Sequence, residues 1–160
     1  CEEMIELETA VLYGASASLP MILLGADAET TEALYRYGRE IGRAFQIQDD
    51  LLDLMASSDD MGKRRGSDLV EGKETLITLH ARQQGVDVDE LVDADTPDEA
   101  TEAAVDDAVD ALADAGSIAY ARETAEDLTA ESKRHLDALP ESGSRSLLAD
   151  LADYLIARGH

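Results

Sequence analysis

The chain lacks the residues and segments on which several protein classes depend. It has a single cysteine, which excludes an internal disulfide framework. It has no uninterrupted run of about 18 apolar residues, so the sequence predicts no membrane-spanning helix. No signal peptide is visible, and Cys1 stands where an initiator methionine would be. We therefore expect the chain to begin within a longer protein, as a fragment of it.

Positive charge is also scarce. Thirteen basic residues face 36 acidic ones, for a formal net charge of -23, and only Lys63, Lys73 and Lys133 are lysines. Such a field repels nucleic acid and anionic lipid, so an anionic substrate would need a local basic site or a bound metal. An acidic surface stays hydrated at high ionic strength. The composition therefore predicts a cytoplasmic protein of a salt-loving cell, without a nucleic-acid partner.

Apolar residues recur at helical spacing along nearly the whole chain. No alternating strand pattern stands out, and 160 residues are enough for one domain with its own core. The sequence thus predicts a single all-α domain, arranged as a helical bundle. The expected helices cover residues 4–25 with an interruption near Pro20, 30–55, 75–84, 98–139 with a break at Gly116, and 146–158, while residues 57–72 and 86–97 are expected to be loops.

Three aspartates on one face of the second expected helix are the most informative feature. At about 100° per residue, Asp49, Asp50 and Asp53 share an arc of roughly 100° with Gln46. No lysine or arginine stands three or four residues from them, so a group outside the helix should offset a repulsion of about 0.2–0.5 kcal/mol per pair. Mg²⁺ takes carboxylate oxygens and often shares them with substrate phosphates. A solvated acidic face without a ligand is the alternative.

The loop after these aspartates carries the strongest basic run of the chain. Lys63, Arg64 and Arg65 are consecutive, and Lys73 follows ten residues after Lys63. Both of these lysines come directly after a glycine, which allows close backbone approach to a ligand. Lysine there would act as a point charge on phosphate. The alternative is that these charges only compensate acidic residues of the same loop. A nucleotide P-loop is excluded, because Glu74 replaces the required serine or threonine.

Three segments together resemble one enzyme family. They are Phe45-Gln-Ile-Gln-Asp-Asp-Leu-Leu-Asp53, Gly62-Lys-Arg-Arg-Gly-Ser-Asp68 and Gly72-Lys-Glu-Thr75. This pattern resembles the trans-isoprenyl diphosphate synthases, which include the geranylgeranyl and farnesyl diphosphate synthases. The aspartates are similar to the second aspartate-rich motif of that family. The resemblance extends along essentially the whole chain and corresponds to the C-terminal half of the family. The first aspartate-rich motif is therefore expected outside this sequence.

The resemblance implies an isoprenoid synthase fold and head-to-tail prenyl transfer. In the family, Mg²⁺ (Mn²⁺ as a substitute) binds the diphosphate of an allylic substrate, and isopentenyl diphosphate attacks the allylic cation. The usual assembly is a homodimer. Carried over residue by residue, Asp49 is the principal metal ligand, Asp50 and Asp53 bind metal directly or through water, Lys63 and Lys73 hold the allylic diphosphate, Phe45 lines the isopentenyl diphosphate site, and Thr9 and Gln46 stabilise the developing cation by their dipoles.

One residue departs from the family pattern. Glu8 precedes Thr9 where the family usually has lysine, and a carboxylate there would repel diphosphate. With half of the family's length missing as well, the chain is not expected to complete the reaction alone. A second interpretation is a non-catalytic truncated paralogue or regulatory subunit that pairs with a complete synthase. A third is an acidic helical scaffold whose aspartates face solvent.

Overall fold

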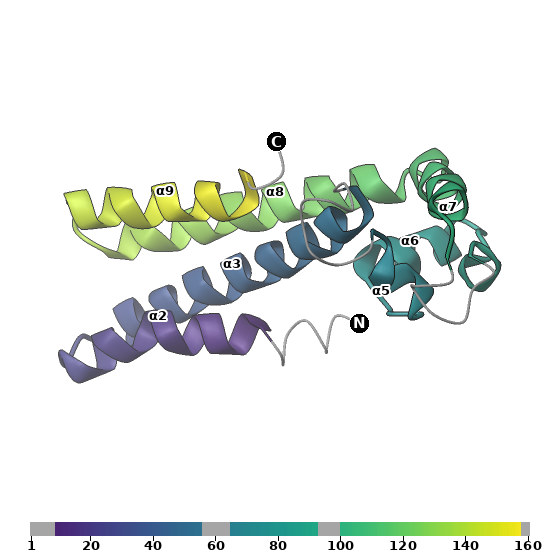
Figure 1. Ribbon diagram of the computed structural model, residues 1–160. Coiled ribbons are helices and arrows are strands. Elements are labelled where there is room, and N and C mark those ends of the chain that lie inside the picture. The colour runs from purple at the N-terminus through teal and green to yellow at the C-terminus, as the bar shows by residue number, and fades with distance from the viewer. Residues whose placement is uncertain (1–8, 56–64, 93–99, 158–160) are drawn as a thin grey trace. The chain divides into compact units, whose positions relative to one another are not determined.

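The structure is a computed structural model that describes residues 9–55, 65–92 and 100–157. Within these ranges the chain forms helices and no strand, which confirms the all-α prediction for the described part (Figure 1). None of the described helices is both long and apolar enough to cross a membrane. The α-helices are α2 (Val11–Leu23), α3 (Ala28–Met55), α5 (Ser67–Val70), α6 (Leu76–Gln83), α7 (Glu102–Asp114), α8 (Ser117–His135) and α9 (Gly143–Ala157), and the 3-10 turns are η2 (Val88–Glu90) and η3 (Leu136–Ala138).

The described residues divide into two compact units. The central unit, Asp49–Glu123, holds α5, α6, η2 and α7. The terminal unit combines residues 9–48 with residues 124–157 and holds α2, η3 and α9. Helices α3 and α8 contribute residues to both units, because each division falls inside one of these two long helices.

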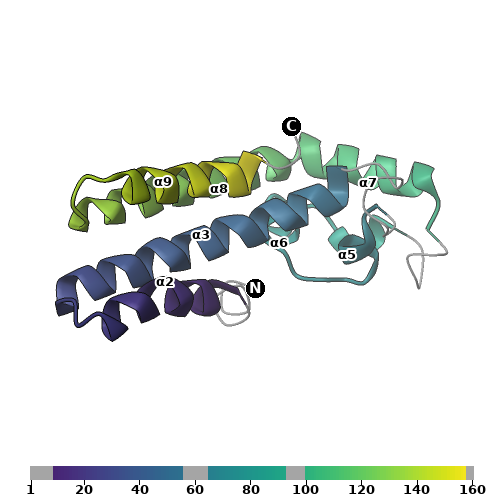
Figure 2. The same ribbon diagram turned by 60° about the vertical axis from the view of Figure 1, so that its left-hand side comes forward.

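In the terminal unit, α2 lies along α3 and α9 lies along α8 in both views (Figures 1 and 2). The tight approach of α2 to α3 depends on a glycine: a Cβ added at Gly42 would stand 2.8 Å from the Cα of Ala10. The phenol of Tyr37 donates a 2.7 Å hydrogen bond to the carbonyl of Leu148 and so fixes α9 against α3. The buried cluster between these helices consists of Leu34, Tyr37, Ile41, Leu136 and Ala152.

The central unit is built on short helices with well-defined ends. Thr75 begins α6 with a capping box, since its hydroxyl accepts the Thr78 N–H while the Thr78 hydroxyl accepts the Thr75 N–H. Thr101 caps α7 by accepting the Ala104 N–H at 3.2 Å. The buried apolar residues of this unit include Leu51, Leu54, Leu69, Ile77, Ala81, Val88, Val105, Val109, Leu112 and Ile118.

Two details of the predicted elements were wrong. The first helix is not interrupted at Pro20, because α2 continues to Leu23 and the Pro20 carbonyl still accepts the Leu24 N–H at 3.0 Å. Residues 57–72 are not entirely a loop, because Ser67–Val70 form α5. The break between the two long C-terminal helices is confirmed, with Gly116 at a φ of 72°.

Candidate functional site

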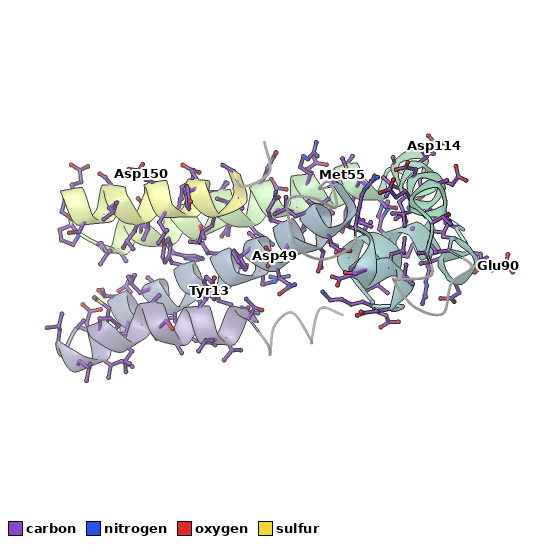
Figure 3. All side chains as sticks on the ribbon, viewed as in Figure 1. Tyr13, Asp49, Met55, Glu90, Asp114 and Asp150 are labelled. Atoms are coloured by element: carbon purple, nitrogen blue, oxygen red, sulfur yellow. The ribbon has the colours of Figure 1, made fainter. Side chains whose placement is uncertain are left out.

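The three aspartates of α3 differ in how they are buried. Asp50 is 3% exposed and Asp53 is 7% exposed, whereas Asp49, labelled in Figure 3, is half-buried. A fully solvated acidic face is therefore wrong for Asp50 and Asp53. Burial of a carboxylate is costly unless the group is paired or hydrogen-bonded, so the neighbours of these two residues decide what they can do.

Asp53 holds the beginning of α5. Its Oδ1 accepts the Ser67 hydroxyl at 2.7 Å, and its Oδ2 accepts the Asp68 N–H at 3.1 Å. Its backbone carbonyl accepts the Gly66 N–H at 2.8 Å. Burial raises the pKa of the Asp53 carboxyl, although the hydrogen bonds from Ser67 and Asp68 act in the opposite direction. Both carboxylate oxygens of Asp53 therefore already accept a hydrogen bond from the turn that starts α5.

Lys73 lies between two carboxylates of this unit. Its Nζ donates to Asp50 Oδ1 at 3.0 Å and to Asp68 Oδ2 at 2.6 Å. Burial alone would lower the pKa of Lys73, but the bonds to Asp68 and Asp50 outweigh it and leave the pKa raised. The sequence predicted that a group outside the helix would offset the repulsion between the aspartates. For Asp50 this group is Lys73. The contact with Asp68 also agrees with the alternative in which this lysine compensates acidic residues of its own segment.

Arg65 and Gly66 join the end of α3 to α5 and α7. The Arg65 guanidinium donates from Nε to the Leu54 carbonyl at 2.6 Å and forms an ion pair with Asp106 of α7. Gly66 has a φ of 73°, which favours glycine, and an added Cβ would meet Val105 Cγ1 at 2.8 Å. The chain must therefore reverse at this position without a side chain, which brings Ser67 and Asp68 back onto Asp53.

Thr9, Phe45 and Gln46, also predicted for the site, lie in the terminal unit. The Thr9 hydroxyl donates to Gln46 Oε1 at 3.0 Å, so the structure brings this predicted pair together. Phe45 is half-buried and packs against Tyr13, with ring centroids 5.7 Å apart and planes tilted by 32°. Lys63 and Glu8 fall outside the described residues. The roles predicted for these side chains stay predictions.

The carboxylates fit a metal site that is completed by substrate phosphates and water better than a site made by protein side chains alone. No group of three or more His, Cys, Asp or Glu side chains in the described residues is placed to hold a metal ion. Both oxygens of Asp53 and the Oδ1 of Asp50 accept hydrogen bonds. Mg²⁺ commonly takes one or two carboxylates and completes its shell with water and substrate phosphates. Asp49 and Asp50 offer that donor chemistry.

Sequence reasoning predicted no contact with Asp53 for two residues that are central to this arrangement. Ser67 and Asp68 bind Asp53 and Lys73, whereas the sequence placed Ser67 only within a motif and Asp68 only among the acidic residues that the loop charges could compensate. The available signal was local, because serine and aspartate directly after glycine are typical of a helix start. Their contact with Asp53, 14 and 15 residues earlier, could not be read from that pattern.

The comparisons with known proteins identify the family. Residues 1–112 match the family model described as Polyprenyl synthetase. This chain belongs to the polyprenyl synthetase family. A geranylfarnesyl diphosphate synthase of Natronomonas pharaonis is 61% identical over 99% of this chain and 45% of its own length. A geranylgeranyl diphosphate synthase of Methanosarcina mazei is 44% identical over 98% of this chain and 47% of its own length.

A solved structure agrees with this family assignment. The geranylgeranyl pyrophosphate synthetase of Geoglobus acetivorans has 40% sequence identity and a TM-score of 0.85, covering 98% of this chain and 47% of its own. The predicted resemblance and the all-α isoprenoid synthase fold are thereby confirmed. The chain spans about half the length of the relatives it matches. A covered share of 45–47% fits either half of a relative, so the C-terminal placement stays a prediction.

Proposed function

We propose that this polyprenyl synthetase chain forms part of a prenyltransferase that elongates an allylic diphosphate with isopentenyl diphosphate. The observation that carries the proposal is the 61% identity to a geranylfarnesyl diphosphate synthase along 99% of the chain. The products proposed from the sequence are geranylgeranyl or farnesyl diphosphate, and the named relatives add geranylfarnesyl diphosphate to the range to be assayed.

Three described residues of the central unit are proposed for the diphosphate part of the reaction. Asp49 and Asp50 would hold Mg²⁺, or Mn²⁺ in its place, which when bound neutralises the charge of a departing diphosphate. Lys73 already balances Asp50 and Asp68 and would add positive charge beside the diphosphate. Lys63 is proposed for the same role from the sequence motif.

The residues of the terminal unit would act on the hydrocarbon part of the reaction. Because Thr9 donates its proton to Gln46, the lone pairs of its hydroxyl oxygen are available for a developing positive charge. Phe45 would line the isopentenyl diphosphate site beside Tyr13. The double bond of isopentenyl diphosphate forms the new carbon–carbon bond, diphosphate leaves the allylic substrate, and proton loss completes the product.

The test is a prenyl-transfer assay on the protein produced with its complete native sequence. Labelled isopentenyl diphosphate would be supplied with allylic diphosphates of increasing length, with and without Mg²⁺. We expect elongation that requires the metal, and a loss of kcat on the order of 100-fold or more in Asp49→Asn. Asp110→Asn, on the exposed side of α7, is the matched control and should keep full activity.

Two outcomes would redirect the assignment. A complete native protein that binds diphosphate with Mg²⁺ but never elongates a substrate would favour the regulatory subunit. No metal-dependent diphosphate binding, together with full tolerance of Asp49→Asn, would favour the acidic scaffold. Light scattering on the same sample tests the proposed homodimer, and cell fractionation tests the proposed cytoplasmic location.

The native gene also decides where the chain belongs in the longer protein. We propose that it is the C-terminal half, because its aspartate motif is followed by the basic loop typical of the second motif. A first aspartate-rich motif upstream is then expected. A motif that instead follows the chain downstream would overturn this placement and assign the chain to the N-terminal half.

A further inference from the structure

Asp53 accepts a hydrogen bond at each of its two carboxylate oxygens. Oδ1 accepts the Ser67 hydroxyl at 2.7 Å, and Oδ2 accepts the Asp68 N–H at 3.1 Å. The side chain is 7% exposed. Each oxygen of this carboxylate already accepts one donor, so a metal ion at Asp53 would have to share a buried oxygen with that donor.

The contacts of Asp53 continue to Lys73, the lysine proposed to add positive charge beside the diphosphate. Asp68 donates its N–H to Asp53 and accepts Lys73 Nζ at 2.6 Å through its own carboxylate. Lys73 also donates to Asp50, which lies one helical turn before Asp53 on α3. The four residues therefore form a closed ring, in which α3 supplies two members and the α5 turn and the following segment supply the others.

We infer that Asp53 is a positioning residue: its carboxylate fixes the Ser67–Asp68 turn to α3, and Asp68 thereby places Lys73 opposite Asp50. This inference rests on the proposed function for the role of Lys73. Ser67 is then the donor that holds the turn to Asp53. The inference replaces the sequence-based prediction that Asp53 itself binds metal.

Three substitutions, made in the protein with its complete native sequence, test whether Asp53 is a positioning residue or a metal ligand. Asp53→Ala removes both acceptors, and Ser67→Ala removes one donor without touching a carboxylate. Asp53→Asn keeps an oxygen for the Asp68 N–H and offers an amide to the Ser67 hydroxyl, but it is a poor metal ligand. Asp110→Asn on α7 is the control for loss of one negative charge.

The first measurement is amide hydrogen exchange at Gly66 and Asp68, whose N–H groups bind Asp53 in the structure. We expect faster exchange at Asp68 in Asp53→Ala, a smaller change in the same direction in Ser67→Ala, and protection near the native level in Asp53→Asn. The Asp53→Ala/Ser67→Ala double variant should exchange no faster at Asp68 than Asp53→Ala alone, because both substitutions break the same attachment of the turn to α3. Unchanged exchange in Asp53→Ala would overturn the inference, and if that variant fails to fold, the other two decide.

The second measurement is Mn²⁺ binding in the presence of pyrophosphate. Asp53→Asn should bind Mn²⁺ within about threefold of the native protein, whereas Asp49→Asn should weaken binding by about tenfold or more. A loss in Asp53→Asn equal to that in Asp49→Asn, with Ser67→Ala unaffected, would show that Asp53 is a ligand. If Asp49→Asn had no effect, the proposed function would fail, while the exchange measurement would still decide the role of Asp53.

Discussion

Thr9 and Gln46 are joined by a hydrogen bond of 3.0 Å across 37 residues of sequence, with the hydroxyl donating to Oε1. The bond fixes the direction in which the Thr9 hydroxyl points its proton. The amide oxygen accepts the threonine proton, and the threonine oxygen keeps its lone pairs. The dipoles of Thr9 and Gln46, for which the sequence predicted a role, are therefore oriented by this hydrogen bond.

Thr9→Val is expected to remove the hydroxyl and its hydrogen bond to Gln46 while keeping the shape of the side chain. If the pair stabilises developing positive charge, kcat should fall by about tenfold with KM nearly unchanged, since such an interaction strengthens only in the transition state. Steady-state kinetics on the complete protein measures both constants. Thr9→Ser restores the hydroxyl and should recover most of kcat. A rise in KM alone would contradict the role in charge stabilisation.

Gly42→Ala is expected to separate α2 from α3. The added Cβ would stand 2.8 Å from the Cα of Ala10, which is backbone and cannot rotate away. We expect a loss of about 1–3 kcal/mol in the free energy of unfolding, measured by urea denaturation. Gly143→Ala is the matched control, because a Cβ there meets nothing within 4 Å. Equal stability of the two variants would refute the tight helix contact.

Tyr37→Phe is expected to change the alkaline limb of the stability curve. Burial raises the pKa of the Tyr37 phenol from 10.0 to about 12. The folded state thus holds the proton more tightly than the unfolded state, so this stabilisation is complete below pH 10 and is lost as pH rises toward 12. The native protein should lose about 2–3 kcal/mol across that window from this group.

In Tyr37→Phe this pH-dependent loss should be absent. The variant should also be about 1 kcal/mol less stable at neutral pH, because the Leu148 carbonyl loses its 2.7 Å hydrogen bond. Urea denaturation between pH 7 and 11.5 measures both effects. Parallel curves for the two proteins throughout that range would show that the phenol is not titrating as the buried site requires.

Lys73→Ala is expected to destabilise the central unit more than an ordinary surface substitution. Asp50 is only 3% exposed and would lose the ammonium that lies 3.0 Å from its Oδ1. Removing one partner of a fully buried pair costs about 3–5 kcal/mol. Because Lys73 is 32% exposed, we expect about 2 kcal/mol.

Lys133→Ala provides the control for Lys73→Ala. Lys133 pairs with Asp153 at 2.5 Å, but that carboxylate is 58% exposed, so the loss should be below about 1 kcal/mol. The double variant Asp50→Asn with Lys73→Ala should recover part of the stability, since the buried negative charge is removed together with its counterion. Equal losses in the two single lysine variants would argue against a structural role for the Lys73 bridge.

The sequence was sufficient for the features that depend on local periodicity and on motif. The helical spacing predicted an all-α chain and the break at Gly116, and the segments around Asp49 and Lys73 identified the family. The continuation of α2 past Pro20 was missed, because a proline removes one donor but does not force the helix to end. The helix at Ser67 was missed because its start depends on Asp53, 14 residues earlier.

What only the tertiary structure decided is how the charged groups share their hydrogen bonds. The sequence placed Asp50 and Asp53 on one helical face and predicted the same metal-binding role for both. The structure distinguishes them, because the reversal of the chain at Gly66 brings Ser67 and Asp68 to Asp53 and leaves Asp50 to Lys73. Helix periodicity is set by contacts three and four residues apart and can be read from the sequence. The partner of a buried charge is set by contacts between segments, which helical spacing does not specify.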